Sequence, residues 1–277
     1  HLVNNASTDD TEKLAIEFSK TDPRFFVHTY NEFANIVTNW NRTVNHIDEN
    51  AKYFKVVQAD DYLMPDSLES LVDLMEKHPS AGIGTSYRII GDKVDGFGIH
   101  FFEGNFHKGQ QMLLRHLYGK TEVTGSITQL FFRIEHLKQV PGYPQIFYPE
   151  EFHDDTRLAY EMLYFSDMVF AFKILNYTRR HESAETITTV DQYNTLLQGR
   201  ESRLYRFLQV YPELERKYKR VRREYGYFLF KAFIKREHKT LDWHKRFLKR
   251  KIKKVEMLSG IIWENRFGSK LAKLLNV

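Results

Sequence analysis

The sequence contains no cysteine, which excludes disulfide bonds and limits any bound metal to oxygen and imidazole ligands. It also lacks a run of about 18 uncharged apolar residues, the length that a membrane-spanning helix needs. Hydrophobic residues make up 42% of the chain and charged residues 28%, as is typical of a globular protein. We therefore expect a folded protein of the reducing cytoplasm, large enough for an α/β domain with an appendage.

Charge is distributed unevenly along the chain. Residues 200–277 contain 23 of the 41 Lys and Arg residues but only 8 of the 36 Asp and Glu residues, a balance of +15. The preceding residues contain 18 basic and 28 acidic residues, a balance of −10. This asymmetry predicts two regions, an α/β domain at 1–198 and a basic helical region at 199–277.

The first region alternates short apolar runs with helical patterns, the rhythm of a mostly parallel sheet flanked by helices. Strands are expected at residues 25–29, 53–57, 81–90 and 127–132. Helices are expected at residues 9–20, 39–50, 66–77, 110–118 and 156–165. Residues 91–108, rich in glycine and aromatic residues, are expected to be irregular.

An acidic pair, Asp60 and Asp61, follows the apolar strand at 53–57. In open α/β sheets, ligands bind beyond the carboxyl ends of the strands. Adjacent carboxylates repel each other unless a cation compensates them, and Mg²⁺ or Mn²⁺ prefers one or two carboxylates with substrate phosphates. The pair therefore indicates a metal site, or else a turn that caps the helix after Pro65.

Two later clusters could also carry chemistry. Asp154 and Asp155 begin a helix, where a carboxylate can act as a general base toward a hydroxyl or simply cap the helix. His181 beside Arg180 could bind a metal or phosphate, although a lone histidine is more often a structural hydrogen-bonding residue. A His153–Asp154 phosphohydrolase pair is a weaker interpretation, because further metal ligands at characteristic spacing are not visible.

Four ordered segments within residues 1–185 resemble the signatures of family 2, GT-A fold glycosyltransferases. The segments are Val3-Asn4-Asn5-Ala6-Ser7-Thr8-Asp9-Asp10-Thr11, Asn39-Trp40-Asn41-Arg42, Lys55 to Pro65, and Val140-Pro141-Gly142-Tyr143 followed by His153 to Leu158. They are similar to the family's second-strand signature, its asparagine-bearing helix, its DxD strand, and its G-G-F and E-D-x-x-L motifs. The family's first strand and helix are not matched, so the resemblance predicts a chain that lacks its N-terminal part.

The resemblance also implies roles for individual residues. Asp60 and Asp61 would contact Mn²⁺ or Mg²⁺ and the donor diphosphate, and His181 would complete the metal site. Asp155 aligns with the catalytic aspartate, and Asp154 takes the place of the preceding glutamate. The implied substrate-binding residues are Asn4, Asn5, Asn41, Asp60, Gly125, Ser126 and Arg180. Gln58 stands where the longer D-x-D-D form of the motif has its first acidic residue.

The implied activity is inverting transfer of a sugar from a nucleotide-diphosphate sugar to a hydroxyl of a glycan or lipid-linked glycan, as in bacterial polysaccharide biosynthesis. The alternative is a non-catalytic GT-A-like protein that binds nucleotide sugars or serves as a scaffold.

The basic region at 199–277 mixes Lys and Arg with large apolar residues, most densely at 225–236 and 245–254. Its apolar residues could form a core-facing stripe, and its basic residues could adsorb to anionic lipid on the inner face of the plasma membrane. We expect no nucleic-acid binding, because the chain carries no zinc-finger, helix-turn-helix or RNA-binding signature.

Overall fold

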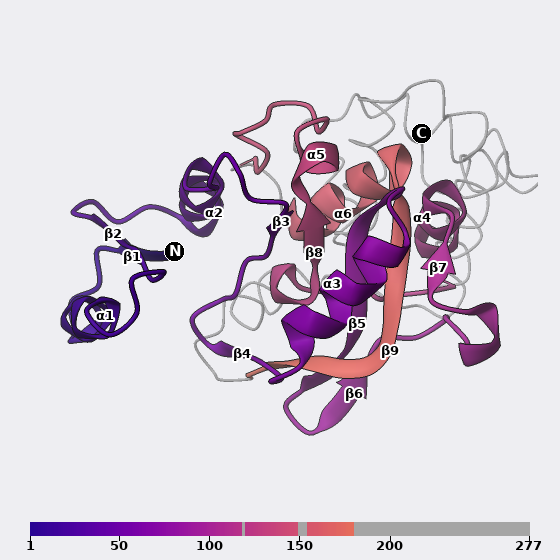
Figure 1. Ribbon diagram of the computed structural model, residues 1–277, viewed down its shortest axis with the longest axis horizontal. Coiled ribbons are helices and arrows are strands. Elements are labelled where there is room, and N and C mark those ends of the chain that lie inside the picture. The colour runs from indigo at the N-terminus through magenta and orange to yellow at the C-terminus, as the bar shows by residue number, and fades with distance from the viewer. Residues whose placement is uncertain (118–119, 149–153, 180–277) are drawn as a thin grey trace, which may run out of the picture. The chain divides into compact units, whose positions relative to one another are not determined.

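The computed structural model describes residues 1–117, 120–148 and 154–179 (Figure 1). These residues belong to the first of two compact units, His1–Arg180. The basic region predicted at 199–277 lies outside the described residues, as do Arg180, His181 and His153. Within the described ranges, no helix has the length and apolar character required to cross a membrane.

The chain begins with a small parallel sheet. Strands β1 (Leu2–Asn5) and β2 (Val27–Tyr30) pair in parallel and are joined through helix α1 (Thr11–Ser19). Helix α2 (Ile36–Asn45) follows and begins after Asn35, whose side chain accepts a hydrogen bond from the Thr38 amide at 2.9 Å. This cap satisfies one of the free N–H groups of the first turn.

A seven-stranded sheet forms the main body, with five strands in the order β3-β8-β5-β9-β4, β6 beside β5, and β7 beside β9. Its strands are β3 (Tyr53–Phe54), β4 (Asp61–Leu63), β5 (Ala81–Ile90), β6 (Lys93–Asp95), β7 (Phe106–His107), β8 (Phe131–Arg133) and β9 (Asp167–Thr178). Strands β5 and β9 pair in parallel, and the other pairs are antiparallel. The α/β class is confirmed, and the sheet is more mixed than the sequence pattern indicates.

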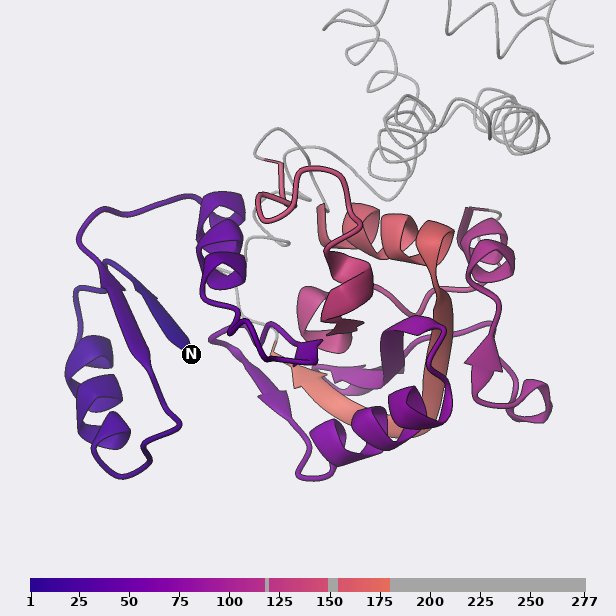
Figure 2. The same cartoon turned by 45° about the horizontal axis from the view of Figure 1, so that its top comes forward.

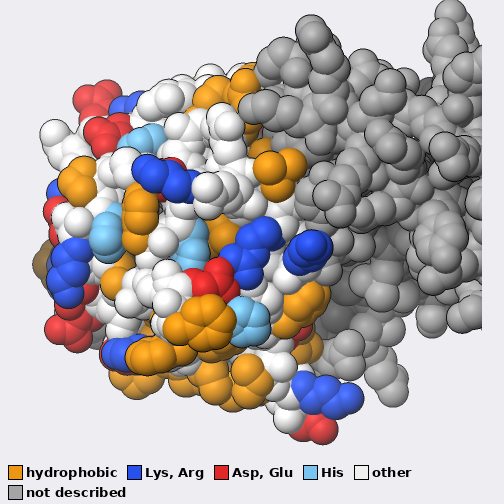
Figure 3. Space-filling view, turned by 90° about the vertical axis from the view of Figure 1, so that its right-hand side faces the viewer, with side chains coloured by type: hydrophobic (Ala, Val, Ile, Leu, Met, Phe, Trp, Pro, Cys, Tyr) orange, Lys and Arg blue, Asp and Glu red, His pale blue; other side chains and the backbone are white. Residues whose placement is uncertain are grey.

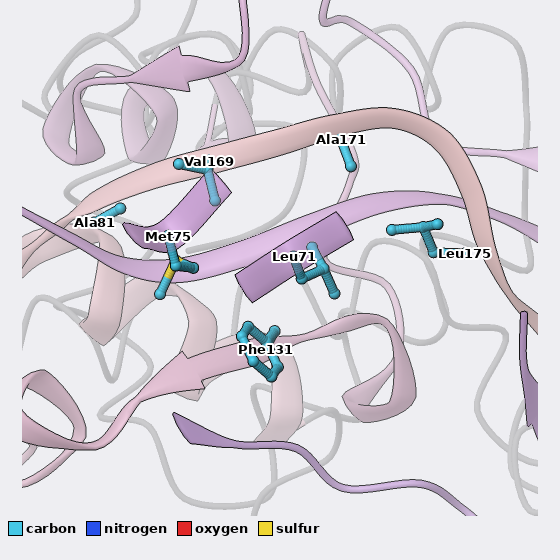
Figure 4. Close-up of a cluster of buried hydrophobic side chains, with 7 residues drawn as sticks. All are labelled: Leu71, Met75, Ala81, Phe131, Val169, Ala171 and Leu175. Carbon is cyan, nitrogen blue, oxygen red and sulfur yellow. The ribbon is translucent and has the colours of Figure 1, made fainter. Parts of the chain in front are cut away.

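Helices cover both faces of this sheet (Figure 2). Helix α3 (Ser67–Lys77) packs on one face, and α6 (Asp154–Phe165) lies on the other. Helices α4 (Gly109–Leu117) and α5 (Ile134–Leu137) and the 3-10 turns η1 (Phe101–Glu103) and η2 (Ile127–Gln129) complete the unit. The core under α3 consists of Leu71, Met75, Ala81, Phe131, Val169, Ala171 and Leu175 (Figure 4).

The excursion at 91–108 is anchored to the rest of the fold near its C-terminal end. Asn105 exchanges hydrogen bonds with the backbone of Phe170 in β9, and Glu103 forms an ion pair with Arg115 of α4. At its tip, Phe101 and Phe102 are 82% and 85% exposed. On the face that carries α4 and β7, hydrophobic side chains lie among charged and His side chains (Figure 3).

Several elements differ from their sequence predictions. The strand expected at 53–57 ends at Phe54, and the one expected at 127–132 divides into η2 and β8. The division occurs because the Ser126 hydroxyl accepts a hydrogen bond from the Thr128 amide and begins a helical turn. Strand β9 was not predicted, although its β-branched and aromatic residues are typical of strands.

Replacing Leu71 by alanine should lower the free energy of unfolding by about 2–5 kcal/mol, because Leu71 is 1% exposed within the core under α3. The matched control is Leu68→Ala in the same helix, since Leu68 is 50% exposed and its truncation should cost much less. Urea unfolding of both variants measures the difference. Equal losses for the two variants would contradict this assignment of the core.

Candidate active site

Asp61 begins β4 and lies in register with Thr178 at the end of β9. Its carboxylate is buried and accepts a hydrogen bond from the Thr178 hydroxyl at 3.5 Å. Burial raises the pKa of Asp61, the Thr128 side chain acts in the opposite direction, and the neighbouring Asp60 carboxylate raises it again. A buried carboxylate beside a second one is a place where a cation would be stabilising.

The residues before Asp61 are joined to the segment around η2 by hydrogen bonds. The Gln58 amide donates to the Thr128 hydroxyl at 3.1 Å, and the Ser126 hydroxyl donates to Gln58 Oε1 at 3.2 Å. Gln58 thus joins the two segments through its backbone amide and its neutral side chain. Ser126, a predicted substrate-binding residue, is brought close to the acidic pair by this link.

Lys55 contacts the backbone of the same segment, at and after η2. Its ammonium donates to the carbonyl oxygens of Thr128 at 2.6 Å and Leu130 at 3.2 Å. Burial lowers the pKa of Lys55 to about 7, while the Asp61 carboxylate acts in the opposite direction. Lys55 thus supports the turn near the acidic pair, a role that no motif in the sequence indicates.

Arg88 is a second basic residue that the sequence analysis missed. Its side chain is 8% exposed and pairs with Asp95 of β6, with Nε and Nη2 each 2.8 Å from Oδ2. Its guanidinium also favours the charged form of Asp61 by electrostatic attraction. The available signal was a single charged residue near the end of the apolar strand β5.

Gly125, also predicted to bind substrate, lies against Arg88. A Cβ atom at this position would be 2.6 Å from Arg88 Nη2, too close for any real contact. A larger residue at this position would therefore displace the end of the Arg88 side chain.

The acidic pair fits a divalent cation that also binds substrate phosphates. Among the described residues there is no group of three or more His, Asp and Glu side chains placed to hold a metal by themselves. Two carboxylates are, however, the protein contribution that Mg²⁺ and Mn²⁺ need when phosphates complete the coordination. The role of His181 as a further ligand stays a prediction, because it lies outside the described residues.

Three predicted substrate-binding asparagines make structural hydrogen bonds. Asn4 Oδ1 accepts from the Ser7 amide at 3.1 Å. Asn5 exchanges bonds of 2.8 and 2.9 Å with the backbone of Ala34, and Asn41 exchanges bonds of 2.7 and 3.0 Å with that of Phe147. These amides hold loops in place, and their contact with substrate stays a prediction.

The helix α6 begins with a buried ion network. Asp154 accepts from Arg157 Nε at 2.5 Å and from the Tyr148 amide at 3.0 Å, and Arg157 Nη1 lies 2.6 Å from Glu161 Oε2. Burial raises the pKa values of Asp154 and Glu161, and Arg157 acts in the opposite direction on both. Asp154 therefore holds the start of α6, and its predicted catalytic role stays a prediction.

Asp155, the predicted catalytic residue, is buried at the start of the same helix. Its Oδ1 accepts a hydrogen bond from the Thr156 amide at 2.7 Å. Its role as a base stays a prediction.

The acidic pair lies where β4 pairs with the end of β9, in a mixed α/β sheet between helices of the GT-A fold class. The family model for glycosyl transferase family 2 matches residues 1–139, half of the chain, and this chain belongs to that family.

A solved structure, the mannosyltransferase PcManGT from Pyrobaculum calidifontis in complex with GDP-Man and Mn²⁺, is similar over 71% of this chain, with 15% sequence identity and a TM-score of 0.47. This chain covers 52% of that protein. No curated protein sequence matches this chain.

Replacing Arg157 by methionine should destabilise the protein by about 3–5 kcal/mol at pH 7, because two buried carboxylates lose their counter-charge. Their pKa values would rise further, so lowering the pH should protonate them in the folded state and recover part of the loss. Arg24→Met, which removes an ion pair whose arginine side chain is 88% exposed, is the control. Urea unfolding at pH 7 and pH 5 checks both points, and a loss that does not change with pH would contradict this account.

Proposed function

We propose that this protein transfers a sugar from a nucleotide-diphosphate sugar to a hydroxyl acceptor. The observation that carries the proposal is the Asp60–Asp61 pair, which lies within the matched residues of a glycosyltransferase family and is linked to the turn around η2. The bound diphosphate would lie beside these carboxylates, and its charge would be compensated by a divalent cation.

Asp60 and Asp61 are the residues that would hold Mn²⁺ or Mg²⁺. When bound, such an ion acts as a Lewis acid that stabilises charge on the leaving diphosphate. Thr178 orients the Asp61 carboxylate, and Lys55 supports the turn opposite it. These contacts hold the Asp61 carboxylate and the neighbouring turn in place.

Asp155 is proposed as the general base. It would accept the proton of the acceptor hydroxyl while that oxygen forms a bond to the anomeric carbon, and the bond to the diphosphate oxygen would break with its electron pair. Attack from the face opposite the diphosphate inverts the configuration. A base in this position contributes about 10²–10⁴-fold. The ion network of Asp154, Arg157 and Glu161 supports the proposal, because it fixes the first turns of α6, where Asp155 lies.

Asp155→Asn should abolish sugar transfer while leaving donor binding intact, whereas Asp61→Asn should weaken donor binding in Mn²⁺. The physical reason is that the first change removes a proton acceptor and the second removes a cation ligand. Thermal stabilisation by UDP-, GDP- and dTDP-sugars with Mn²⁺ measures binding, and release of nucleoside diphosphate to added acceptors measures turnover.

Asp73→Asn, an exposed position in α3, is the control that should change neither quantity. Near-normal turnover in Asp155→Asn would refute the base. Binding without turnover in the unaltered protein would favour the non-catalytic alternative.

We also propose that the acceptor is a glycan or lipid-linked glycan and that residues 200–277 bind an anionic membrane surface. The support is the charge balance of +15, since each basic residue near such a surface contributes about 1 kcal/mol. The full chain should co-sediment with vesicles containing phosphatidylglycerol but not with phosphatidylcholine vesicles, and a chain ending at residue 199 should lose this binding. A salt-sensitive shift of DNA or RNA without vesicle binding would contradict it.

A further inference from the structure

A polar cluster extends from the acidic pair across three neighbouring strands. In register, Arg88 of β5 lies opposite Asn176 of β9, and Thr178 lies opposite Asp61 of β4. Residues in register, and residues two apart in one strand, project from the same face of a sheet. Arg88, Asn176, Thr178 and Asp61 therefore share one face, in agreement with the hydrogen bond from Thr178 to Asp61.

Asp95 holds the Arg88 guanidinium in position and engages only some of its N–H donors. Both of its short contacts to Asp95 go to a single oxygen, Oδ2. A guanidinium has five N–H donors, so this pair uses only part of its capacity. Gly125 keeps the space next to Nη2 open, and Asp95 is 34% exposed at its side chain, so the pair borders solvent.

Asn176 provides a second observation that points to a ligand. Its side chain is 1% exposed, and within the described part of the chain Nδ2 has no hydrogen-bond partner. A buried amide donor that stays unpaired is costly and needs an explanation. An acceptor group on a bound molecule would satisfy it.

The charges of the cluster favour a neutral ligand with hydroxyl groups. Arg88 already pairs with Asp95, so a ligand carboxylate that approached the guanidinium would be repelled by the Asp95 carboxylate. A sugar hydroxyl both donates and accepts. It can accept from Arg88 or Asn176 and donate to Asp95.

We propose that Arg88, Asp95 and Asn176 form the subsite that recognises hydroxyl groups of the donor's sugar, and that this sugar is a neutral hexose, not a uronic acid. The inference rests on the proposed function. Gly125 contributes to the subsite by leaving space for the Arg88 side chain. We therefore expect Gly125 to affect binding of the sugar donor.

The test compares the dissociation constant of a nucleoside diphosphate with that of the corresponding nucleotide sugar, by calorimetry in Mn²⁺. The probes are UDP, GDP and dTDP, their glucose, galactose and mannose conjugates where these exist, and UDP-glucuronic acid. The unaltered protein should bind one neutral nucleotide sugar more tightly than its diphosphate. Arg88→Met and Asn176→Leu should each reduce that preference about tenfold or more, because a polar subsite discriminates strongly. Binding of the diphosphate alone should stay within about twofold in Asn176→Leu, which changes no charge, and Arg88→Met should weaken binding of the diphosphate less than binding of the nucleotide sugar.

Gly125→Ala should reproduce the effect of Arg88→Met by displacing the guanidinium. Arg115→Met is the matched control, because Arg115 also pairs with a carboxylate of the 91–108 excursion, Glu103, and should leave both constants unchanged. If Arg88→Met does not fold, Arg88→Lys and Asp95→Asn replace it with the same expected loss.

Three results would overturn the inference. Equal weakening of diphosphate and nucleotide sugar would place Arg88 at the phosphates, and unchanged preferences in every variant would remove the subsite. A preference of the unaltered protein for UDP-glucuronic acid would contradict the neutral sugar. If the unaltered protein binds neither diphosphates nor nucleotide sugars, the proposed function itself fails and this inference fails with it.

Discussion

The parallel pairing of β5 with β9 is the constraint on which the rest of the described structure depends. On one side it supports the core under α3, where Leu71 and Met75 pack against residues of both strands. At the carboxyl ends of the two strands, the same register sets Arg88 opposite Asn176. Because β4 pairs with the last residues of β9, this register also decides where Asp61 lies. A shift of one residue would turn these polar side chains to the opposite face of the sheet.

Several acidic side chains of this protein are paired with a nearby arginine, and Asp61 differs from them. Asp95 is neutralised by Arg88, and Asp154 is neutralised by Arg157. Asp61 instead has a second carboxylate beside it and forms no ion pair with a basic side chain of the described residues, so a cation and a diphosphate are the compensation that its surroundings favour.

The elements that could be predicted from the sequence are those with a strong local signal. Helix α3 follows from its apolar spacing and the proline before it, and strand β5 from its continuous apolar run. The ordered motifs around Asp60, Asp61 and Asp155 indicated the family before any geometry was available. Arg88 and Lys55 were missed because a single basic residue carries no motif, and their importance comes from residues 37 and 73 positions away, Gly125 and Thr128. Strand β9 was missed although its composition is typical of a strand.

The acidic pair, the class of fold and the family are determined by the sequence alone, because apolar periodicity and short motifs act over a few residues. Only the tertiary structure decided which polar residues are held by contacts to distant parts of the fold. The side-chain amides of Asn5 and Asn41 form hydrogen bonds with backbone groups. Gln58 joins two segments, and Gly125 leaves space for the Arg88 guanidinium. The physical reason is that a hydrogen bond or an ion pair depends on distance and direction in space, and residues distant in the chain acquire both only when the sheet sets its register.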